Sequence, residues 1–312
     1  MAAGKTPKRQ GSRPGKPVEP LLDALTRSGI GGFPIEIWLA MANAMAPAGV
    51  RYQDADAKAL CRARPDQVSA HQTADGMRYQ LAVGADGAVG RLLMSDPSIA
   101  AAMEDTFGPF TVEDKIAAAL IELLDTPASD PGVRRYLERH LPAQCADGTG
   151  SGIGALRARA GERGIDLLLA KALDRRASRV SSAEKVAMRR EAVTLFAAAG
   201  AVAESAELRG VLSADLAAAG DLAAAIEELE LAAADYRQEA ARNSFQLKFV
   251  ALTELNLGRL YSRAGRRGDA RTATKTAVAL FASIAAEDHR FADEVQVARR
   301  QLKQLRWRGT VR

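Results

Sequence analysis

The chain has 312 residues, enough for about two domains that each bury their own core. Hydrophobic residues make up 47% of the composition, aromatic residues only 5%, and alanine is very frequent. This composition favours thin, closely packed helices over a sheet-based sandwich, and the length excludes a single small module. We therefore expect a mainly α protein.

The net charge of +5 is concentrated at the two ends of the sequence. Residues 1–20 carry five basic residues and one acidic residue, and residues 299–312 carry six basic residues and no acidic one. Because the total is +5, residues 21–298 carry a net charge of −5. The basic character therefore belongs to the ends and does not describe the folded body.

Cysteine content and hydropathy indicate a cytoplasmic protein. Cys61 and Cys145 are the only cysteines and form no C-x-x-C pair, so we expect no disulfide framework. Residues 1–20 are basic without an apolar core, which predicts a disordered tail rather than a signal peptide. The most apolar stretch, residues 33–50, contains Glu36 and two prolines, so we expect no membrane span and no membrane partner.

Short helices precede a hairpin in the first third of the chain. Helices are predicted at residues 21–27, 34–45 and 54–62. Alternating apolar residues predict strands at 68–71 and 77–83, and the intervening segment 72–76 ends in Asp75-Gly76, a hairpin signal. This order of elements resembles that of a winged-helix domain.

Helices then resume and continue almost to the end of the chain. The segment Thr111-Val112-Glu113-Asp114 resembles a capping box and predicts the start of an amphipathic helix. A further helix is predicted at 133–145, and the glycine-rich stretch 148–154 is the best internal boundary. A long helix is predicted to open at residue 181, and helical hairpins to continue to Leu305.

One spaced pattern in the second half is the most informative feature of the sequence. Small and large residues follow the order L-G-x-x-Y-x8-A-x6-A, formed by Leu257, Gly258, Tyr261, Ala270 and Ala277. This register resembles that of a tetratricopeptide helix hairpin, in which Gly258 and Ala270 allow close approach, Tyr261 fills the space beside them and Ala277 meets the next hairpin.

A looser copy of this pattern lies upstream. Gly220-Asp221 make the turn, and Ala225 and Ala232 have the offsets that Ala270 and Ala277 have from Gly265. The copies are 45 residues apart, so we expect an insertion of about one helical segment relative to the usual 34-residue period.

These features together predict a winged-helix-like N-terminal domain with a small β-hairpin, followed by a tetratricopeptide-like helical repeat array. The expected segments are a disordered basic tail at 1–20, a winged-helix-like and helical linker domain at 21–147, a glycine-rich connector at 148–154, tetratricopeptide-like repeats at 155–307 and a basic end at 308–312.

Residues 30–160 resemble a known family, the signal-transducing P-loop ATPases called STAND proteins. The matching pieces are Gly32-Phe33-Pro34 with Ile37-Trp38 and Ala42, Asp54-Ala55-Asp56, the Asp75-Gly76 hairpin with Tyr79, and Tyr136-x-x-Arg139-His140-Leu141. The resemblance implies a winged-helix and helical linker followed by a repeat sensor. Gln144 stands where the family often has a second histidine, and no ATPase domain is recognised.

Motifs for catalysis, cofactors or metals do not occur in the sequence. Gly4-Lys5-Thr6 offers only the last three residues of a phosphate-binding loop, and Gly150-x-Gly152 follows a predicted helix where a dinucleotide site requires a strand. His71, His140 and His289 fall in three separate elements without metal-ligand spacing. We therefore expect no enzymatic activity, no cofactor and no metal.

The first helix of a tetratricopeptide hairpin lines a concave groove, which places candidate binding residues on the helix containing Gly258. The residues expected to face or border the groove are Gln246, Lys248, Leu252, Leu255, Asn256, Arg259, Ser262 and Arg263. Among them Lys248, Asn256, Arg259 and Arg263 are the candidate partner-binding residues. Two arginines and an amide favour an acidic or carboxylate-bearing protein or peptide. A solvated helix face without a ligand is the alternative for these residues.

The sequence thus predicts a non-catalytic cytoplasmic protein-interaction or regulatory module that uses a helical-repeat groove. The alternative is a DNA-binding transcriptional regulator with a winged helix and a repeat sensor domain. Nucleic acid is the less favoured partner, because the candidate recognition helix carries Asp54 and Asp56 where it would approach phosphate, with Lys58, Arg62 and Arg64 further along.

Overall fold

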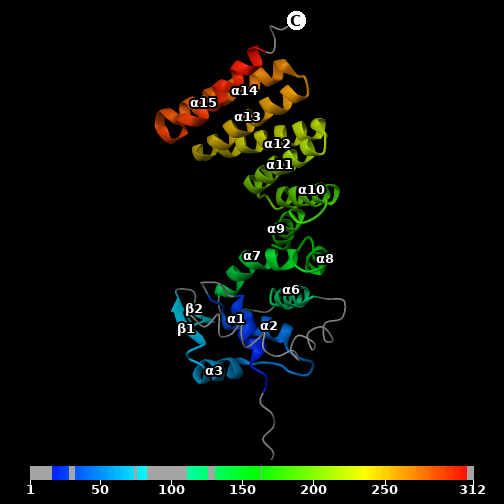
Figure 1. Cartoon of the computed structure of the whole chain (residues 1–312), viewed down its shortest axis with the longest axis vertical. Helices are drawn as coiled ribbons and strands as arrows, with labels where there is room; N and C mark the ends of the chain where they lie inside the picture. Colours follow the sequence, from blue (N-terminus) through cyan, green and yellow to red (C-terminus); the bar gives the residue numbers. More distant parts are fainter. Residues whose placement is uncertain are drawn as a thin grey trace, which may run out of the picture. The chain divides into compact units, whose positions relative to one another are not determined.

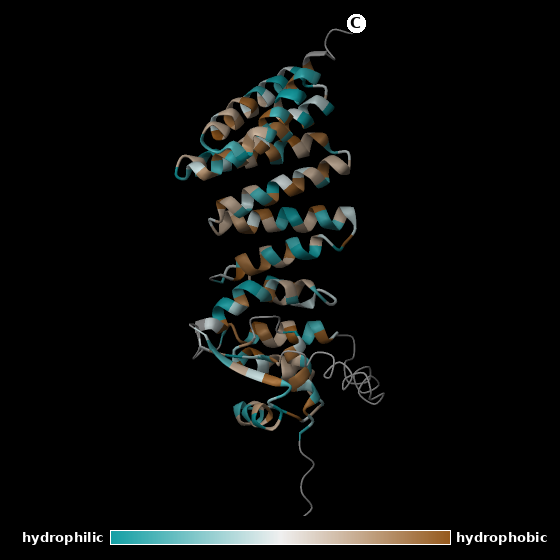
Figure 2. Cartoon of the chain, turned by 60° about the vertical axis from the view of Figure 1, so that its left-hand side comes forward, coloured by the Kyte–Doolittle hydropathy of each residue, from teal (hydrophilic) through white to brown (hydrophobic). Residues whose placement is uncertain are grey.

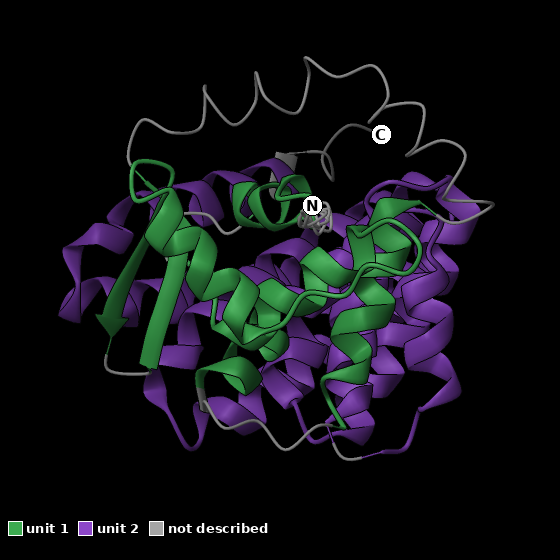
Figure 3. Ribbon diagram, turned by 90° about the horizontal axis from the view of Figure 1, so that it is seen from below, with its two compact units in different colours: residues 1–139 green, residues 140–312 purple. Residues whose placement is uncertain are grey.

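The structure is a computed structural model, and it describes residues 16–27, 32–73, 76–82, 111–125, 131–162 and 164–307. The chain is mainly helical with one small antiparallel hairpin, as predicted. It divides into two compact units, Met1–Arg139 and His140–Arg312 (Figure 3).

The first unit contains short helices and the hairpin (Figure 1). Its elements are α1 (Glu19–Thr26), α2 (Ile35–Met45), α3 (Asp54–Ala63), β1 (Val68–Thr73), β2 (Gly76–Leu81), α6 (Val112–Glu122) and the beginning of α7 (Pro131–Ala146). Pro34 lies at the N-cap of α2 rather than inside its first turn.

Aromatic residues form the centre of the first unit. Phe33 pairs with Tyr79 of β2 in an isolated bridge, and its ring centroid lies 5.2 Å from that of Tyr136. The Trp38 ring lies 5.3 Å from Tyr79, and its indole N–H donates to the Leu21 carbonyl over 2.7 Å. The aromatic residues that carry the family resemblance therefore share one core.

The strands of the hairpin differ in their bounds from the prediction: β1 extends two residues further, to Thr73, and β2 begins one residue earlier and ends two residues earlier. Val68 pairs with Leu81 and Thr73 with Gly76, so the connecting segment shortens from 72–76 to residues 74–75. The reason is that Thr73 joins the ladder and its hydroxyl donates to the Gly76 carbonyl over 2.8 Å. Residues 74, 75 and 83 lie outside the described part of the chain.

The capping box at the start of α6 is confirmed. The Thr111 hydroxyl accepts from the Asp114 backbone N–H, and the Asp114 carboxylate accepts from the Thr111 backbone N–H over 3.0 Å. Ile116 and Leu120 are buried on the inner face of the helix. These reciprocal bonds satisfy donors that the first turn of a helix leaves without partners.

The second unit is a succession of helices, and Figure 2 shows hydrophilic and hydrophobic residues distributed around each of them. After the end of α7 its elements are α8 (Ser151–Ala158), α9 (Ile165–Ala177), α10 (Ser182–Ala198), α11 (Val202–Ala218), α12 (Leu222–Ala240), η2 (Ser244–Gln246), α13 (Leu247–Arg263), α14 (Arg267–Glu287), η3 (His289–Phe291) and α15 (Ala292–Trp307).

Three of the turns between these helices have one geometry. Gly200, Gly220 and Gly265 each have a positive φ, between 73° and 91°. The residue after each glycine donates its N–H to a carbonyl five residues earlier, for example Arg266 to Tyr261 over 2.8 Å. This is the Schellman motif, which ends a helix on glycine and reverses the chain within a few residues.

The expected insertion between the two pattern copies is wrong. The interval from Gly220 to Gly265 contains α12, α13 and, between them, only the three-residue 3-10 turn η2, so no additional α-helix is present. The extra length comes from the helices themselves, because α12 has 19 residues and α13 has 17. Element starts then recur at a spacing of 45 residues, as for Leu222 of α12 and Arg267 of α14.

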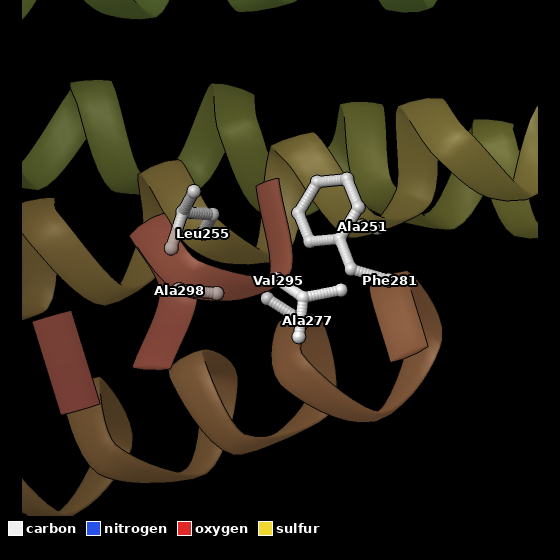
Figure 4. Packing of buried hydrophobic residues seen from close by; sticks show 6 residues of the cluster. All are labelled: Ala251, Leu255, Ala277, Phe281, Val295 and Ala298. Carbon is white, nitrogen blue, oxygen red and sulfur yellow. The ribbon is translucent and has the colours of Figure 1, made fainter. Parts of the chain in front are cut away.

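The small-and-large pattern occupies close-contact positions, as predicted. A Cβ built on Gly258 would collide with Thr274 Oγ1 of α14 and lie 3.3 Å from the Ala270 carbonyl oxygen. Tyr261 is buried. Ala277 lies in a cluster of small and apolar side chains from α13, α14 and α15, formed by Ala251, Leu255, Ala277, Phe281, Val295 and Ala298 (Figure 4).

The glycine-rich stretch 148–154 is not a connector throughout. Gly148 and Gly150 turn the chain with positive φ, but α8 begins at Ser151 because Ile153 and Leu156, three residues apart, are both buried. The compact units divide earlier, between residues 139 and 140 and so inside α7, rather than at the glycines.

The predicted tail 1–20 is also too long at its inner end. Helix α1 begins at Glu19, the Tyr52 hydroxyl donates to the Pro17 carbonyl over 2.6 Å, and Lys16 Nζ lies 2.7 Å from the Asp56 carboxylate. Residues 1–15 and the predicted basic end 308–312 lie outside the described residues.

Candidate functional site

One face of α13 carries the predicted binding residues. Leu252, Asn256, Arg259 and Arg263 follow one another at spacings of four, three and four, and all are exposed. Residues at such spacings lie on the same side of a helix. Leu255, which we expected at the groove, is instead buried in the cluster of Figure 4, because it lies on the side of α13 that meets α14 and α15.

A hollow of about 500 Å³ lies between α13 and α15, and we call it the arginine hollow. Its lining residues are Gly258, Arg259, Ser262 and Arg263 from α13, and Val297, Arg300, Gln301, Gln304 and Leu305 from α15. Three arginines face this space, and among the residues that the structure describes no carboxylate lines it. The structure thus brings together two of the four predicted binding residues and adds a third cation from α15.

The three guanidinium groups bond to neutral oxygens. Arg259 donates to Gln301 Oε1 over 3.0 Å and to Asn256 Oδ1 over 3.1 Å. Arg263 donates to the Ala217 carbonyl of α11 over 3.0 Å, and Arg300 to the Gln296 carbonyl over 3.4 Å. Neutral acceptors orient the arginines without cancelling their charge, so their positive potential remains available to a ligand.

Gln301 joins three helices beneath the hollow. Its amide nitrogen donates to the Leu255 carbonyl of α13 over 3.0 Å and to Thr274 Oγ1 of α14 over 3.1 Å. The amide oxygen accepts from Arg259. Gly258 makes this arrangement feasible, because a side chain there would come within 2.8 Å of Gln301 Nε2.

Lys248 and Asn256 lie on α13 but outside the arginine hollow. Lys248 precedes Arg259 by eleven residues, which is about 16 Å along a helix, and its Nζ lies 3.5 Å from the Phe245 ring centroid. It does not line the arginine hollow. Asn256 does not line it either, but holds the Arg259 guanidinium from one turn earlier.

Sequence reasoning missed the contribution of α15. The sequence prediction counts Arg300 only in the basic charge of residues 299–312, whereas its helix supplies five of the nine lining residues, Gln301 and Gln304 among them. The 45-residue spacing is a signal for Gln301 and Gln304, because it maps Asn256 and Arg259 onto them. It gives no signal for Arg300, which corresponds to the buried Leu255.

A second hollow, of about 330 Å³, lies where α12 and α14 meet α13, and we call it the acidic hollow. Its lining residues are Glu230, Ala233, Arg237, Glu254, Leu257, Tyr261, Asp269, Thr272, Ala273 and Thr276. Each of the three carboxylates has a partner: Tyr261 for Glu230, Arg237 for Glu254 and Arg266 for Asp269.

The acidic hollow is a packed polar network. Burial raises the pKa of Glu254, and the Arg237 guanidinium opposes that rise. Burial and then the hydrogen bond to Glu230 raise the pKa of Tyr261 to about 12, so its phenol stays a donor at neutral pH. With its charges paired internally, this hollow has little charge left for a ligand.

Other reactive groups lie apart from both hollows. Cys145 is buried, which raises its thiol pKa to about 12, whereas His140 on the same helix is exposed. Within the described ranges, no group of three or more His, Cys, Asp or Glu side chains is placed to hold a metal ion. The helices in the described part of the chain are all too short or too polar to cross a membrane.

The acidic residues of α3 stabilise its first turn. Asp56 accepts from the Gln53 backbone N–H over 2.8 Å and pairs with Lys16, while Asp54 pairs with Lys58 over 2.9 Å. These contacts neutralise Lys58, one of the three cations we considered for phosphate contact. Arg62 and Arg64 are exposed at the other end of the helix.

Comparison with protein-family models, curated proteins and solved structures finds no match for this chain.

Proposed function

We propose that the chain is a non-catalytic interaction module that binds an acidic protein or peptide segment at the arginine hollow. The observation that carries the proposal is the convergence of Arg259, Arg263 and Arg300 on one cavity without a lining carboxylate. Guanidinium groups form strong, charge-assisted bonds to carboxylates, and three of them in one cavity favour a ligand with more than one negative charge.

Other arginines of the second unit provide a contrast that supports this proposal. Arg189 is buried between Asp174 and Asp215, Arg209 pairs with Glu228 over 2.7 Å, and Arg237 pairs with Glu254. These arginines join consecutive helices through internal ion pairs. Within the described ranges the arginines of the hollow pair with no such carboxylate, so an external one completes their pairing.

The fold that we propose for the second unit is a tetratricopeptide-like repeat array. Supporting observations are the recurring element starts, the shared Schellman turns and the close approach at Gly258. Repeats of this kind present a continuous surface for a partner segment. By resemblance, we propose a regulatory role similar to that of the linker and sensor portion of a STAND protein, in the cytoplasm, where two free cysteines remain reduced.

A DNA-binding regulator is the second candidate, and the hairpin of the first unit favours it. The Phe33 to Tyr79 bridge adds a third extended segment between α1 and α2, which agrees with a winged-helix order of elements. Arg62 and Arg64 are exposed near the end of α3. Against DNA contact, the first turn of that helix carries two carboxylates, which repel phosphate.

Affinity capture from nuclease-treated lysate at two salt concentrations tests the favoured function. The double variant Arg259→Glu/Arg263→Glu should lose a protein partner that the parent chain captures at moderate salt. The matched control is Arg267→Glu/Arg271→Glu, which makes the same charge change at exposed positions of α14, and it should retain the partner. Equal capture by both variants rejects the arginine hollow, and loss of all capture after nuclease treatment favours the DNA-binding alternative.

A further inference from the structure

Exposed apolar side chains gather at the beginning of α13, before the arginines. The Phe245 side chain in η2 is 63% exposed and Leu252 is 41% exposed. Between them, Lys248 extends its ammonium group over the Phe245 ring. We call Phe245 and Leu252 the apolar end of the α13 face.

The apolar end and the arginine hollow are connected by one exposed helix face. Leu252 precedes Arg259 by seven residues and Arg263 by eleven, which correspond to about 10 Å and about 16 Å along a helix. An extended peptide covers about 3.3–3.6 Å per residue, so three to five of its residues span these distances. The neighbouring helix α11 adds exposed Val211, which the 45-residue spacing maps onto Asn256 of the same face.

We propose that the ligand is bipartite: an extended acidic segment in which an apolar side chain precedes or follows a pair of carboxylates by three to five residues. The apolar side chain contacts Phe245 and Leu252, and the carboxylates bond to Arg259 and Arg263. This inference rests on the proposed function, because the arginine hollow supplies the charge complementarity. It adds the apolar end, which fixes the spacing of the ligand and disfavours polyanions without apolar groups, such as inorganic polyphosphate.

The charged and apolar ends of the α13 face contribute to specificity in different ways. Charge alone attracts any acidic chain and weakens as salt screens it. Burial of an aromatic or leucine side chain adds a contribution that salt does not screen, on the order of a tenfold gain in affinity per well-covered side chain. Together the two ends select acidic segments with an apolar residue at the required distance.

Selection of random dodecapeptides displayed on phage against the full chain tests this inference. We expect enriched peptides to contain two Asp or Glu residues and one large apolar residue separated by three to five positions. The apolar-end variant Phe245→Ser/Leu252→Ser should lose the apolar preference and bind an enriched peptide at least tenfold more weakly. Its matched control is Leu231→Ser, which removes a 44% exposed leucine from α12 and should leave affinity unchanged.

The possible results separate this inference from the function on which it rests. Enrichment of acidic peptides without an apolar preference, or equal affinity for the parent and the apolar-end variant, overturns the bipartite ligand and leaves acidic binding intact. Enrichment that ignores acidic residues, or binding unaffected by Arg259→Glu/Arg263→Glu, overturns the proposed function itself. A selection that enriches no peptide counts against both.

Discussion

The step from α11 to α13 and the step from α13 to α15 share one register but differ in their exposed side chains. The three helices begin at Val202, Leu247 and Ala292, each 45 residues after the last. From α11 to α13 buried positions keep their character, as in Leu212 and Leu257. The same holds for the alanines that follow the glycine turns before α12 and α14. From α13 to α15 the buried Leu255 is replaced by the exposed Arg300, so helix packing fixes the buried residues of the first step more strictly than those of the second.

Exposed positions follow a different rule. Ala214 and Ala218 are exposed on α11, and 45 residues later the chain has Arg259 and Arg263, also exposed. Because α11 packs with alanine at these two positions, packing of this kind does not require arginine at the corresponding positions of α13. The comparison therefore separates residues that the helix stack needs from residues available for binding.

One partly buried charged position changes sign between α11 and α13 but stays in an ion pair. Arg209 of α11 pairs with Glu228, and at the corresponding position of α13 Glu254 pairs with Arg237. Both partners lie on α12, so this position forms an ion pair with α12 from either helix even though its charge reverses. Loss of one partner should reduce stability at these sites, in contrast to the exposed arginines.

The largest effect on stability is expected at Gly258, where α13 and α14 pack most closely. Gly258→Leu should lower the free energy of unfolding by about 3 kcal/mol, the upper end of the usual range for overpacking. Gly258→Ala should lower it by about 1 kcal/mol, because even a methyl group collides with Thr274 Oγ1 and this outweighs the gain in helix propensity. Urea denaturation measures both differences.

A glycine of α11 provides the control for this prediction. Gly210 lies in α11 with no atom within 4 Å of a built Cβ, so Gly210→Ala should stabilise the protein by about 0.5–1 kcal/mol. Adding Thr274→Ala to Gly258→Ala should recover part of the loss. Similar stability changes for Gly258→Ala and Gly210→Ala would contradict the close contact at Gly258.

A smaller loss is expected from breaking an internal ion pair. Arg209→Ala leaves the Glu228 and Asp235 carboxylates without their cation, and should destabilise the protein by about 2 kcal/mol, because these groups are only partly exposed. Arg242→Ala removes an exposed pair with Glu239 and should cost less than about 0.5 kcal/mol. Equal losses on thermal unfolding would show that burial of the pair does not matter.

The pH dependence of stability should reveal the buried carboxyl group of Glu254 in α13. Burial raises the folded-state pKa of Glu254 above its ordinary value of 4.5, so this group binds more protons in the folded chain. Its contribution to stability therefore falls as pH rises from the unfolded to the folded pKa. Arg237→Ala raises the folded pKa further and should cost about 1 kcal/mol at pH 7 but little at pH 4.

The matched test of that assignment is the neutral side chain. Glu254→Gln in the Arg237→Ala background should remove the additional pH dependence. A stability deficit of Arg237→Ala that is the same at both pH values would assign its effect to lost packing by the arginine stem.

The smallest effect is expected from the basic N-terminal segment. Deletion of residues 1–15 keeps Lys16 and its contact with Asp56, so the melting temperature should stay within about 1 °C of the parent. Partner capture should weaken only at low salt, because the attraction of these basic residues for an acidic partner is screened by salt. Complete loss of the partner at moderate salt would place specificity in this segment instead of the arginine hollow.

The pattern around Gly258 was predictable because local spacing determines it. A glycine opposite Ala270, a tyrosine one turn later and an alanine toward the next helix are features of sequence periodicity, and the structure places each in a close contact or the core. The Thr111 capping box was predictable for the same reason, since its bonds span only three residues.

The other half of the arginine hollow was not predictable in this way. Arg300 and Gln301 meet Arg259 across 41 and 42 residues, and such a meeting depends on helix lengths and turn geometry that local spacing does not give. The prediction for the glycine-rich stretch was wrong for a related reason. Its composition predicts a connector, whereas burial of Ile153 and Leu156 orders α8 there.

The central claim is that Arg259 and Arg263 serve binding and not packing, and one double variant tests it most directly. Thermal unfolding and affinity for an acidic peptide enriched on the parent chain should be measured on Arg259→Ala/Arg263→Ala. We expect a melting temperature within about 2 °C of the parent and at least a tenfold loss of affinity. A melting temperature lowered as far as that of Arg209→Ala, with affinity unchanged, would contradict it.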